Sequence, residues 1–347
     1  DHSDTVRRVL VLIAVGAAVS IIWFLLQRRT KLASVKAQIR GETPQERRPG
    51  FLRQTPHSLT QIVAVGAGAP VRELGALFAG RLADLMRIPQ TVRPVLVASA
   101  AAAGLAAMYQ VPVGGFVFLF EALGLALSLR NIFTGAVLVL VATCTAHLVI
   151  SDAPTYPVPQ LQTTGESLLL AVILGLAITP LALWFRAASQ RAESRKTTNR
   201  NVLWRLPLVL ALVAVTSMFL PEILGNGRPL TQHIFDAASG LSSSSSRFDA
   251  TALGQALLYA LAMLAAKAIL VVASLRNGAY GGTLTPGLAL GSACGFVLTG
   301  TLILVFPTLT QLQPGAGALH ASELLGTAGL LGAVTFLSLS MNAPLSA

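Results

Sequence analysis

The sequence predicts an all-α polytopic membrane protein. Hydrophobic residues make up 54% of the 347 residues, charged residues only 11%, and the mean hydropathy is +0.69. A soluble domain of ordinary composition carries about 25% charged residues. The apolar segments are long enough to cross a bilayer as helices, which need about 20 apolar residues each.

The apolar segments differ in length, and glycine or proline interrupts several of them. They cover residues 9–26, 59–86, 94–109, 113–129, 132–150, 167–184, 202–220, 250–274, 283–305 and 321–339. Broken segments predict tilted, partial or re-entrant helices, which persist in lipid only where protein covers the freed backbone groups.

The basic residues are concentrated in two segments. Residues 28–53 hold eight Lys and Arg and residues 186–205 hold six, whereas the polar loops 152–166 and 308–322 hold none. Basic loops stay on the cytoplasmic side of a membrane. We therefore expect an integral protein of the cell (inner) membrane, with loops 28–53 and 186–205 cytoplasmic. The net charge of +11 is explained by this asymmetry, so we expect no nucleic-acid partner.

A weak internal repeat divides the chain. "APVRELGALFAG" (69–80) parallels "TPGLALGSACG" (285–295), since both contain Pro-x-x-x-Leu-Gly, and the helix at 101–115 parallels the one at 331–347. Two halves with the same order of broken helices are typical of duplicated transporters and channels. We expect one transmembrane domain over 1–347, with a first repeat at about 1–150, a second at about 165–347, and no soluble regulatory domain. Because the second half stops soon after Pro344, we expect the terminal helices of the repeats to be missing from this sequence.

Four glycine-rich or proline-containing stretches predict helix starts: "GAGAP" (66–70), "GGTLTP" (281–286), "ASVKAQ" (33–38) and "GNGRPL" (225–230). A helix N-terminus carries free N–H groups and about half a positive charge, so it binds anions. Several such starts that meet at mid-membrane would solvate an anion without trapping it beside a full charge.

Among the ionisable residues within the apolar segments, the candidates are Arg72, Glu73, Glu121 and Lys267. Charges at membrane depth are costly and are therefore functional candidates. The alternative for Glu121 and Lys267 is that each lies near a helix end, snorkels to the interface or meets a backbone partner. For Arg72 and Glu73 the alternative is a structural ion pair.

These stretches resemble the CLC family of chloride channels and anion/proton exchangers. "GAGAPVRELGALFAGRLADL" (66–85) is similar to its G-[KR]-E-G-P helix, "AAAAGLAAMYQVPVGGFVFLFEA" (100–122) to the conserved stretch that follows, and "GAYGGTLTPGLALGSACG" (278–295) to its G-x-F-x-P helix. The resemblance implies a CLC-like fold of two inverted-topology repeats with tilted and broken helices. It also implies a homodimer in the lipid bilayer, with one anion pathway in each subunit.

The first motif departs from the family at its functional centre. Gly66 and Pro70 match the motif, but Ala67 replaces its basic residue, Gly68 its gating glutamate and Ala69 its second glycine. In the family's exchangers that glutamate closes the pathway when it is ionised and carries protons when it is neutral. Gly68 can do neither.

Other family positions differ as well. Ala122 takes the place of the internal proton glutamate, Leu284 takes the aromatic position of G-x-F-x-P, and only Ser34 matches the family's G-S-G-I-P region. On a helix, Arg72 would lie about 40° from the face of Gly68 and Glu73 about 140° from it. Arg72 could therefore draw anions toward the pathway.

We expect passive, channel-like conduction of a small anion, chloride first, without proton coupling. The expected anion pathway consists of Ser34, Gly66, Gly68, Ala69, Pro70, Val71, Arg72, Gly282, Thr283, Leu284, Thr285 and Pro286. One alternative is an anion/proton exchanger with a relocated acid, Glu73 or Glu121. Another is a non-conducting member of the family with a scaffold or regulatory role. We expect no cofactor, no metal site and no enzymatic activity.

Overall fold

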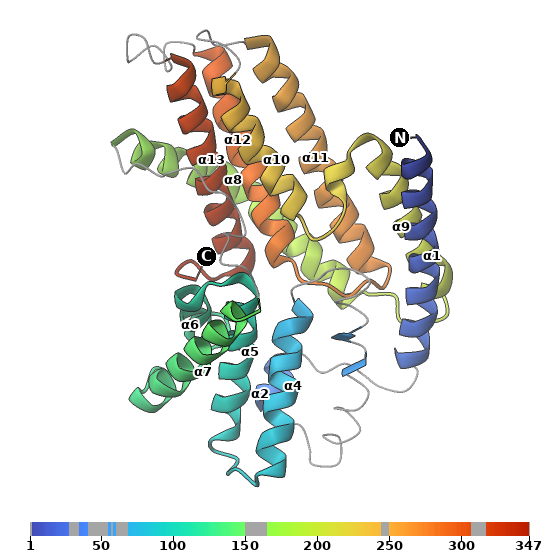
Figure 1. The fold of residues 1–347 in the computed structure, drawn as a ribbon, viewed down its shortest axis with the longest axis vertical. Helices are drawn as coiled ribbons and strands as arrows, with labels where there is room; N and C mark the ends of the chain where they lie inside the picture. Colours follow the sequence, from blue (N-terminus) through green and yellow to red (C-terminus); the bar gives the residue numbers. More distant parts are fainter. Residues whose placement is uncertain are drawn as a thin grey trace.

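The computed structural model describes most of the chain as packed helices (Figure 1). The described residues are 2–27, 35–40, 55–56, 58–59, 69–149, 165–243, 250–306 and 317–346. The elements are α1 (His2–Gln27), α2 (Val35–Arg40), α4 (Ala69–Leu85), α5 (Arg93–Tyr109), α6 (Pro112–Glu121), α7 (Leu129–His147), α8 (Gly165–Ser194), α9 (Val202–Phe219), the 3-10 turn η1 (Pro221–Ile223), α10 (Arg228–Ser243), α11 (Ala250–Arg276), α12 (Leu284–Val305) and α13 (Gly317–Met341). These residues form no strand, so the predicted all-α class is confirmed.

Six of these helices are long and apolar enough to cross a membrane: α7, α8, α9, α11, α12 and α13. Three more, α1, α5 and α6, contain shorter apolar stretches. The unequal lengths agree with the predicted mixture of full and partial spans.

Two predicted boundaries were wrong. The segment expected at 113–129 is helical only as far as Glu121, because Gly124 adopts a left-handed backbone (φ 72°) and Ser128 caps the next helix by accepting from the Asn131 N–H. The basic segment 186–205, expected as a loop, belongs to α8 as far as Ser194. Alanine and glutamine are good helix formers and let α8 continue beyond its apolar part.

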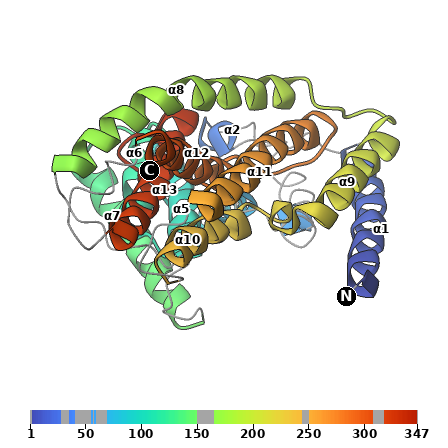
Figure 2. The same cartoon turned by 90° about the horizontal axis from the view of Figure 1, so that it is seen from above.

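The helices form two groups, and α1 and α9 pack together as a pair beside them. In Figure 1, α4 to α7 occupy the lower part and α10 to α13 the upper part, while α1 packs with α9 at one side. Seen from above, α8 runs along one edge of the molecule and contacts α11, α12 and α13 (Figure 2). The largest hydrophobic core lies among these upper helices and α8 and includes Phe185, Phe296 and Phe336.

Glycines bring α12 and α13 into close backbone contact. A Cβ atom added to Gly295 would lie 2.7 Å from the carbonyl carbon of Ala328, and one added to Gly291 would lie 2.8 Å from the Cα of Ala333. Gly332 faces Gly291 and Gly295 from α13. Small residues four apart are the usual means of close helix packing in membranes.

The pair α4–α5 repeats this arrangement in the first half of the chain. A Cβ added to Gly104 on α5 would lie 2.9 Å from the Val71 carbonyl oxygen, at the start of α4. Both α5 and α13 end on a left-handed residue, Gln110 (φ 56°) and Asn342 (φ 56°), two positions before a proline. The two halves therefore share local geometry at the positions where the sequence repeats.

Candidate functional site: a cavity at the helix starts

A cavity of about 650 Å³ opens between the two halves of the molecule. All four predicted helix starts coincide with observed ones, at α2, α4, α10 and α12. Three of them contribute residues to this cavity: Arg72 and Glu73 from α4, Gly225 and Asn226 before α10, and residues 281–286 at α12. The structure thus brings together segments that are more than 200 residues apart in the sequence.

The start of α12 supplies five predicted pathway residues to the cavity wall: Gly282, Thr283, Leu284, Thr285 and Pro286. No side chain caps this helix at Thr283, and the Thr283 carbonyl accepts the Gly287 N–H at 2.9 Å. The first-turn N–H groups that precede Pro286 have no partner within the helix, as at any helix start. This end of α12 therefore presents hydrogen-bond donors to the cavity.

Tyr109 adds a hydroxyl group that the sequence did not predict. It is the last residue of α5, and its hydroxyl lies 2.7 Å from the Thr285 Oγ1 in the first turn of α12. Both residues line the cavity. The sequence pointed to Tyr109 in one way alone, because its polar ring lies at the end of a helix, directly before the turn at Gln110.

Arg72 and Glu73 lie together on the wall contributed by α4. The Arg72 Nε is buried without a hydrogen-bond partner, and its guanidinium carbon is 5.8 Å from the centre of the Phe118 ring. Although Arg72 and Glu73 were expected on different faces of the helix, both line the cavity. Among the described residues, neither Arg72 nor Glu73 forms an ion pair with an opposite charge.

Lys267 is buried in α11 with 3% of its surface exposed, and it also lines the cavity. Its ammonium group donates to the carbonyl oxygens of Ile223 at 2.7 Å and Gly225 at 2.8 Å. This is the backbone contact that the sequence left open as an alternative. Both acceptors are uncharged carbonyl oxygens, so these contacts pair Lys267 with no opposite charge.

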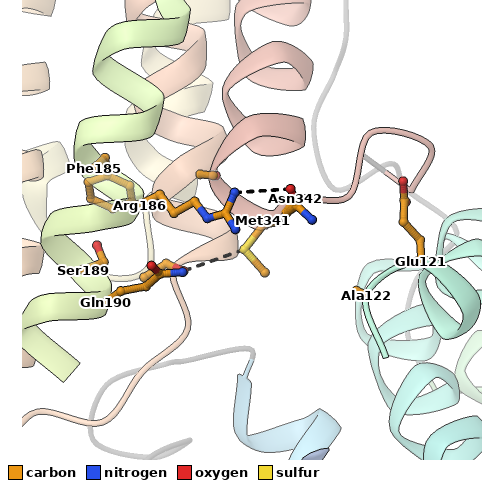
Figure 3. A pocket seen from close by; sticks show the side chains of 10 residues that line it. Glu121, Ala122, Phe185, Arg186, Ser189, Gln190, Met341 and Asn342 are labelled. Carbon is orange, nitrogen blue, oxygen red and sulfur yellow. Dashed lines mark hydrogen bonds between the residues drawn. The ribbon is translucent and has the colours of Figure 1, made fainter. Parts of the chain in front are cut away.

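A smaller cavity of about 330 Å³ adjoins the first one (Figure 3). Ser189, Gln190, Thr283 and Met341 line both cavities. Arg186 and Gln190 project from α8 toward the end of α13, where the Arg186 Nη1 lies 3.3 Å from the Asn342 Oδ1. The shared wall connects the basic end of α8 with the start of α12.

Glu121 stands at the far side of the smaller cavity, next to Ala122 (Figure 3). Its two carboxylate oxygens accept the backbone N–H groups of Leu345 and Ser346, each at 2.9 Å. A carboxylate that accepts two N–H groups just after a proline acts as a cap for that turn. The contact ties the end of α6 to the end of the described chain.

An ion pair closes the cavity on the side of α8. Lys196 donates to Glu193 at 2.6 Å and lies 3.6 Å from the centre of the Tyr280 ring, and both Glu193 and Tyr280 line the large cavity. Burial lowers the pKa of Lys196, while the charge of Glu193 opposes that shift. A positive group is therefore fixed behind the carboxylate of Glu193.

Three predicted pathway residues, Ser34, Gly66 and Gly68, lie outside the described residues. Ala69, Pro70 and Val71 form the first turn of α4. The expectation that Gly68 leaves the pathway without a gating acid therefore remains a prediction from the sequence.

The chain is similar to known CLC proteins in sequence. The family model described as "Voltage gated chloride channel" matches residues 15–347. Voltage-gated ClC-type chloride channels ClcB from Escherichia coli strains SMS-3-5 and K12 / DH10B are each 28% identical over 300 residues, which cover 83% of this chain. The chain spans 64% of the length of these relatives.

Solved structures share the fold at low sequence identity. A slow cyanobacterial Cl⁻/H⁺ antiporter matches 97% of this chain and 83% of its own, with a TM-score of 0.68 and 16% identity. A CLC-type fluoride/proton antiporter matches 99% of this chain and 96% of its own, with a TM-score of 0.57 and 15% identity. The predicted CLC-like fold is thus confirmed. Because the family model matches nearly the whole chain, this integral membrane protein belongs to the voltage-gated chloride channel (CLC) family.

Proposed function

We propose that this protein conducts small monovalent anions, chloride first, passively across the cell membrane. The observation that carries the proposal is the cavity between the two halves, where the start of α12 meets Arg72 and Lys267. Hydrogen-bond donors and two cations face one space. An anion is the ligand that such a wall binds best.

The charge balance of the wall favours transit over tight binding. The two cations Arg72 and Lys267 are offset by Glu73 and Glu193, and Lys196 in turn pairs with Glu193. The excess of positive charge is therefore small. Conduction requires a site that attracts the ion but also releases it.

The route toward the cytoplasm runs through the smaller cavity. Arg186 lies at its wall, and Ser189, Gln190 and Thr283 continue into the larger one. Since the basic residues of 186–205 are expected on the cytoplasmic side, Arg186 would attract anions at that entrance. On this proposal, Ala122 provides no proton station beside the route.

Reconstitution into liposomes tests the proposal directly. Purified protein in chloride-loaded vesicles, with valinomycin to balance charge, should release chloride while a pH dye inside the vesicles reports no coupled proton movement. Uphill proton movement driven by a chloride gradient would refute passive conduction. The absence of any anion flux from a folded, stable protein would instead support the scaffold role.

Arg72 should contribute to this flux. Arg72→Ala should lower chloride flux several-fold, because it removes a cation whose Nε has no other partner. Arg87→Ala is the matched control, since Arg87 is exposed in the turn after α4 and does not line the cavity. Equal fluxes from the two variants would remove Arg72 from the pathway.

One observation favours a second candidate, an anion/proton exchanger. Glu73 lines the cavity, so a carboxylate is present on the route despite Gly68. Under that candidate, Glu73→Gln abolishes proton movement and leaves chloride flux. Glu121 suits the role less well, because both of its oxygens already accept backbone N–H groups.

We further propose that the protein works as a homodimer, as the family resemblance implies. Light scattering of the purified protein at a mass of two chains would support this assembly. A single-chain mass at micromolar concentration would contradict it.

A further inference from the structure

We propose that the hydroxyl groups of Tyr109 and Thr285 together bind the transported anion and set its affinity. The inference rests on the proposed function and deepens it, because it assigns a ligand pair that bridges the two halves of the chain. The two oxygens lie 2.7 Å apart on the wall of the larger cavity.

The fold holds both hydroxyl groups in place. Tyr109 ends α5, where the left-handed Gln110 stops the helix, so the turn fixes the backbone that carries the ring. Thr285 lies in the first turn of α12 with only 5% of its surface exposed. The contact joins residues 176 positions apart, from opposite halves of the chain.

The Tyr109–Thr285 pair has one O–H group that their mutual hydrogen bond does not use. Two hydroxyl groups carry two O–H protons, and their mutual hydrogen bond uses one of them. Whichever oxygen accepts that bond keeps its own O–H, for which no acceptor occurs among the described residues. This unused O–H group lies on the cavity wall, and an incoming anion would accept a hydrogen bond from it.

The spacing of the two oxygens favours a single small ion. Donor oxygens 2.7 Å apart can both reach one acceptor when their mutual bond opens. The Coulomb attraction of a donor for an anion increases as their separation decreases. The pair should therefore favour a compact halide such as chloride over a larger, more diffuse anion such as thiocyanate.

The neighbours of the pair supply further donors. The start of α12 presents its free N–H groups beside Thr285, and the buried Arg72 Nε, which has no partner, belongs to a residue that lines the same cavity. An ion bound by the hydroxyl pair would thus be near both a helix N-terminus and a cation.

Substitutions at the pair test the inference by chloride titration calorimetry of the purified protein. Tyr109→Phe and Thr285→Val should each raise the chloride Kd about tenfold, since each removes a hydrogen bond to a charged group. Thr285→Ser should retain the wild-type Kd, because it keeps the hydroxyl. Tyr259→Phe is the control, since it breaks a tyrosine hydrogen bond to Glu222 that lies away from the cavity.

Anion preference gives a second measurement that a purely structural bond would not change. In vesicles, the ratio of chloride to thiocyanate flux should fall in Tyr109→Phe and stay constant in Tyr259→Phe. A lower melting temperature of Tyr109→Phe with unchanged Kd and flux ratio would overturn the inference. If the unmodified protein neither binds nor conducts any anion, the proposed function itself is refuted, and the inference that rests on it is refuted with it.

Discussion

The substitution Gly295→Ala should loosen the central helix pair α12–α13. The added Cβ would lie 2.7 Å from the Ala328 carbonyl carbon, whereas ordinary van der Waals contact begins at 3.4 Å. The atoms it meets belong to the backbone of α13, so no side-chain rotation can relieve the contact. The helices would have to separate by about 1 Å, and overpacking of this kind typically costs about 1–3 kcal/mol.

Alanine also stabilises a helix relative to glycine by about 0.5–1 kcal/mol, which offsets part of that cost. The net loss of stability should be about 1–2 kcal/mol. The assay is thermal unfolding of the purified protein, followed by circular dichroism. We expect the midpoint to fall by about 4 °C.

Gly254→Ala provides the matched control in the neighbouring helix α11. A Cβ at Gly254 would meet no atom within 4 Å, so only the helix-propensity gain remains and the midpoint should rise slightly. Equal midpoints for Gly295→Ala and Gly254→Ala would refute the argument from close backbone contact.

Three further predictions concern the cavity. Gly104→Ala should raise the chloride Kd several-fold in calorimetry, because its Cβ would push against the Val71 carbonyl at 2.9 Å and displace the start of α4; an unchanged Kd would contradict this. Lys267→Met should cost about 1–3 kcal/mol in a thermal unfolding series, because the buried Ile223 carbonyl and the Gly225 carbonyl both lose their donor, and no loss would show that water replaces it. Glu121→Gln should leave chloride flux in vesicles unchanged and proton flux absent, whereas altered coupling would restore Glu121 as a relocated acid.

The sequence predicted the helix starts well because their signals are local. Glycine and proline at a helix start act on the backbone within one turn, and the starts of α4, α10 and α12 follow from them. The break after Glu121 was missed, because residues 122–128 are apolar enough to continue a helix and only Gly124 disturbs the pattern.

The site was predicted only in part, because its polar contacts join distant residues. Arg72 and the start of α12 were expected from motifs, and both line the cavity. The bond between Tyr109 and Thr285 and the cap that Glu121 provides for Leu345 join residues more than 170 positions apart. No local pattern specifies such a pairing, which depends on how the two halves meet.

The cavity combines a frame set by glycine contacts with a small number of charged side chains on its wall. Gly104 lets α5 approach the start of α4, and Gly291 lets α12 approach α13, so close backbone contacts hold both helix pairs of the frame. Its charges, Arg72 and Lys267, lie on elements that this frame positions. Substitution of Arg72, whose Nε has no partner, should therefore change anion affinity with little change in stability, whereas Lys267 also holds two carbonyls. Substitutions of the glycines should change stability and affinity together, and this difference separates them from Arg72 by experiment.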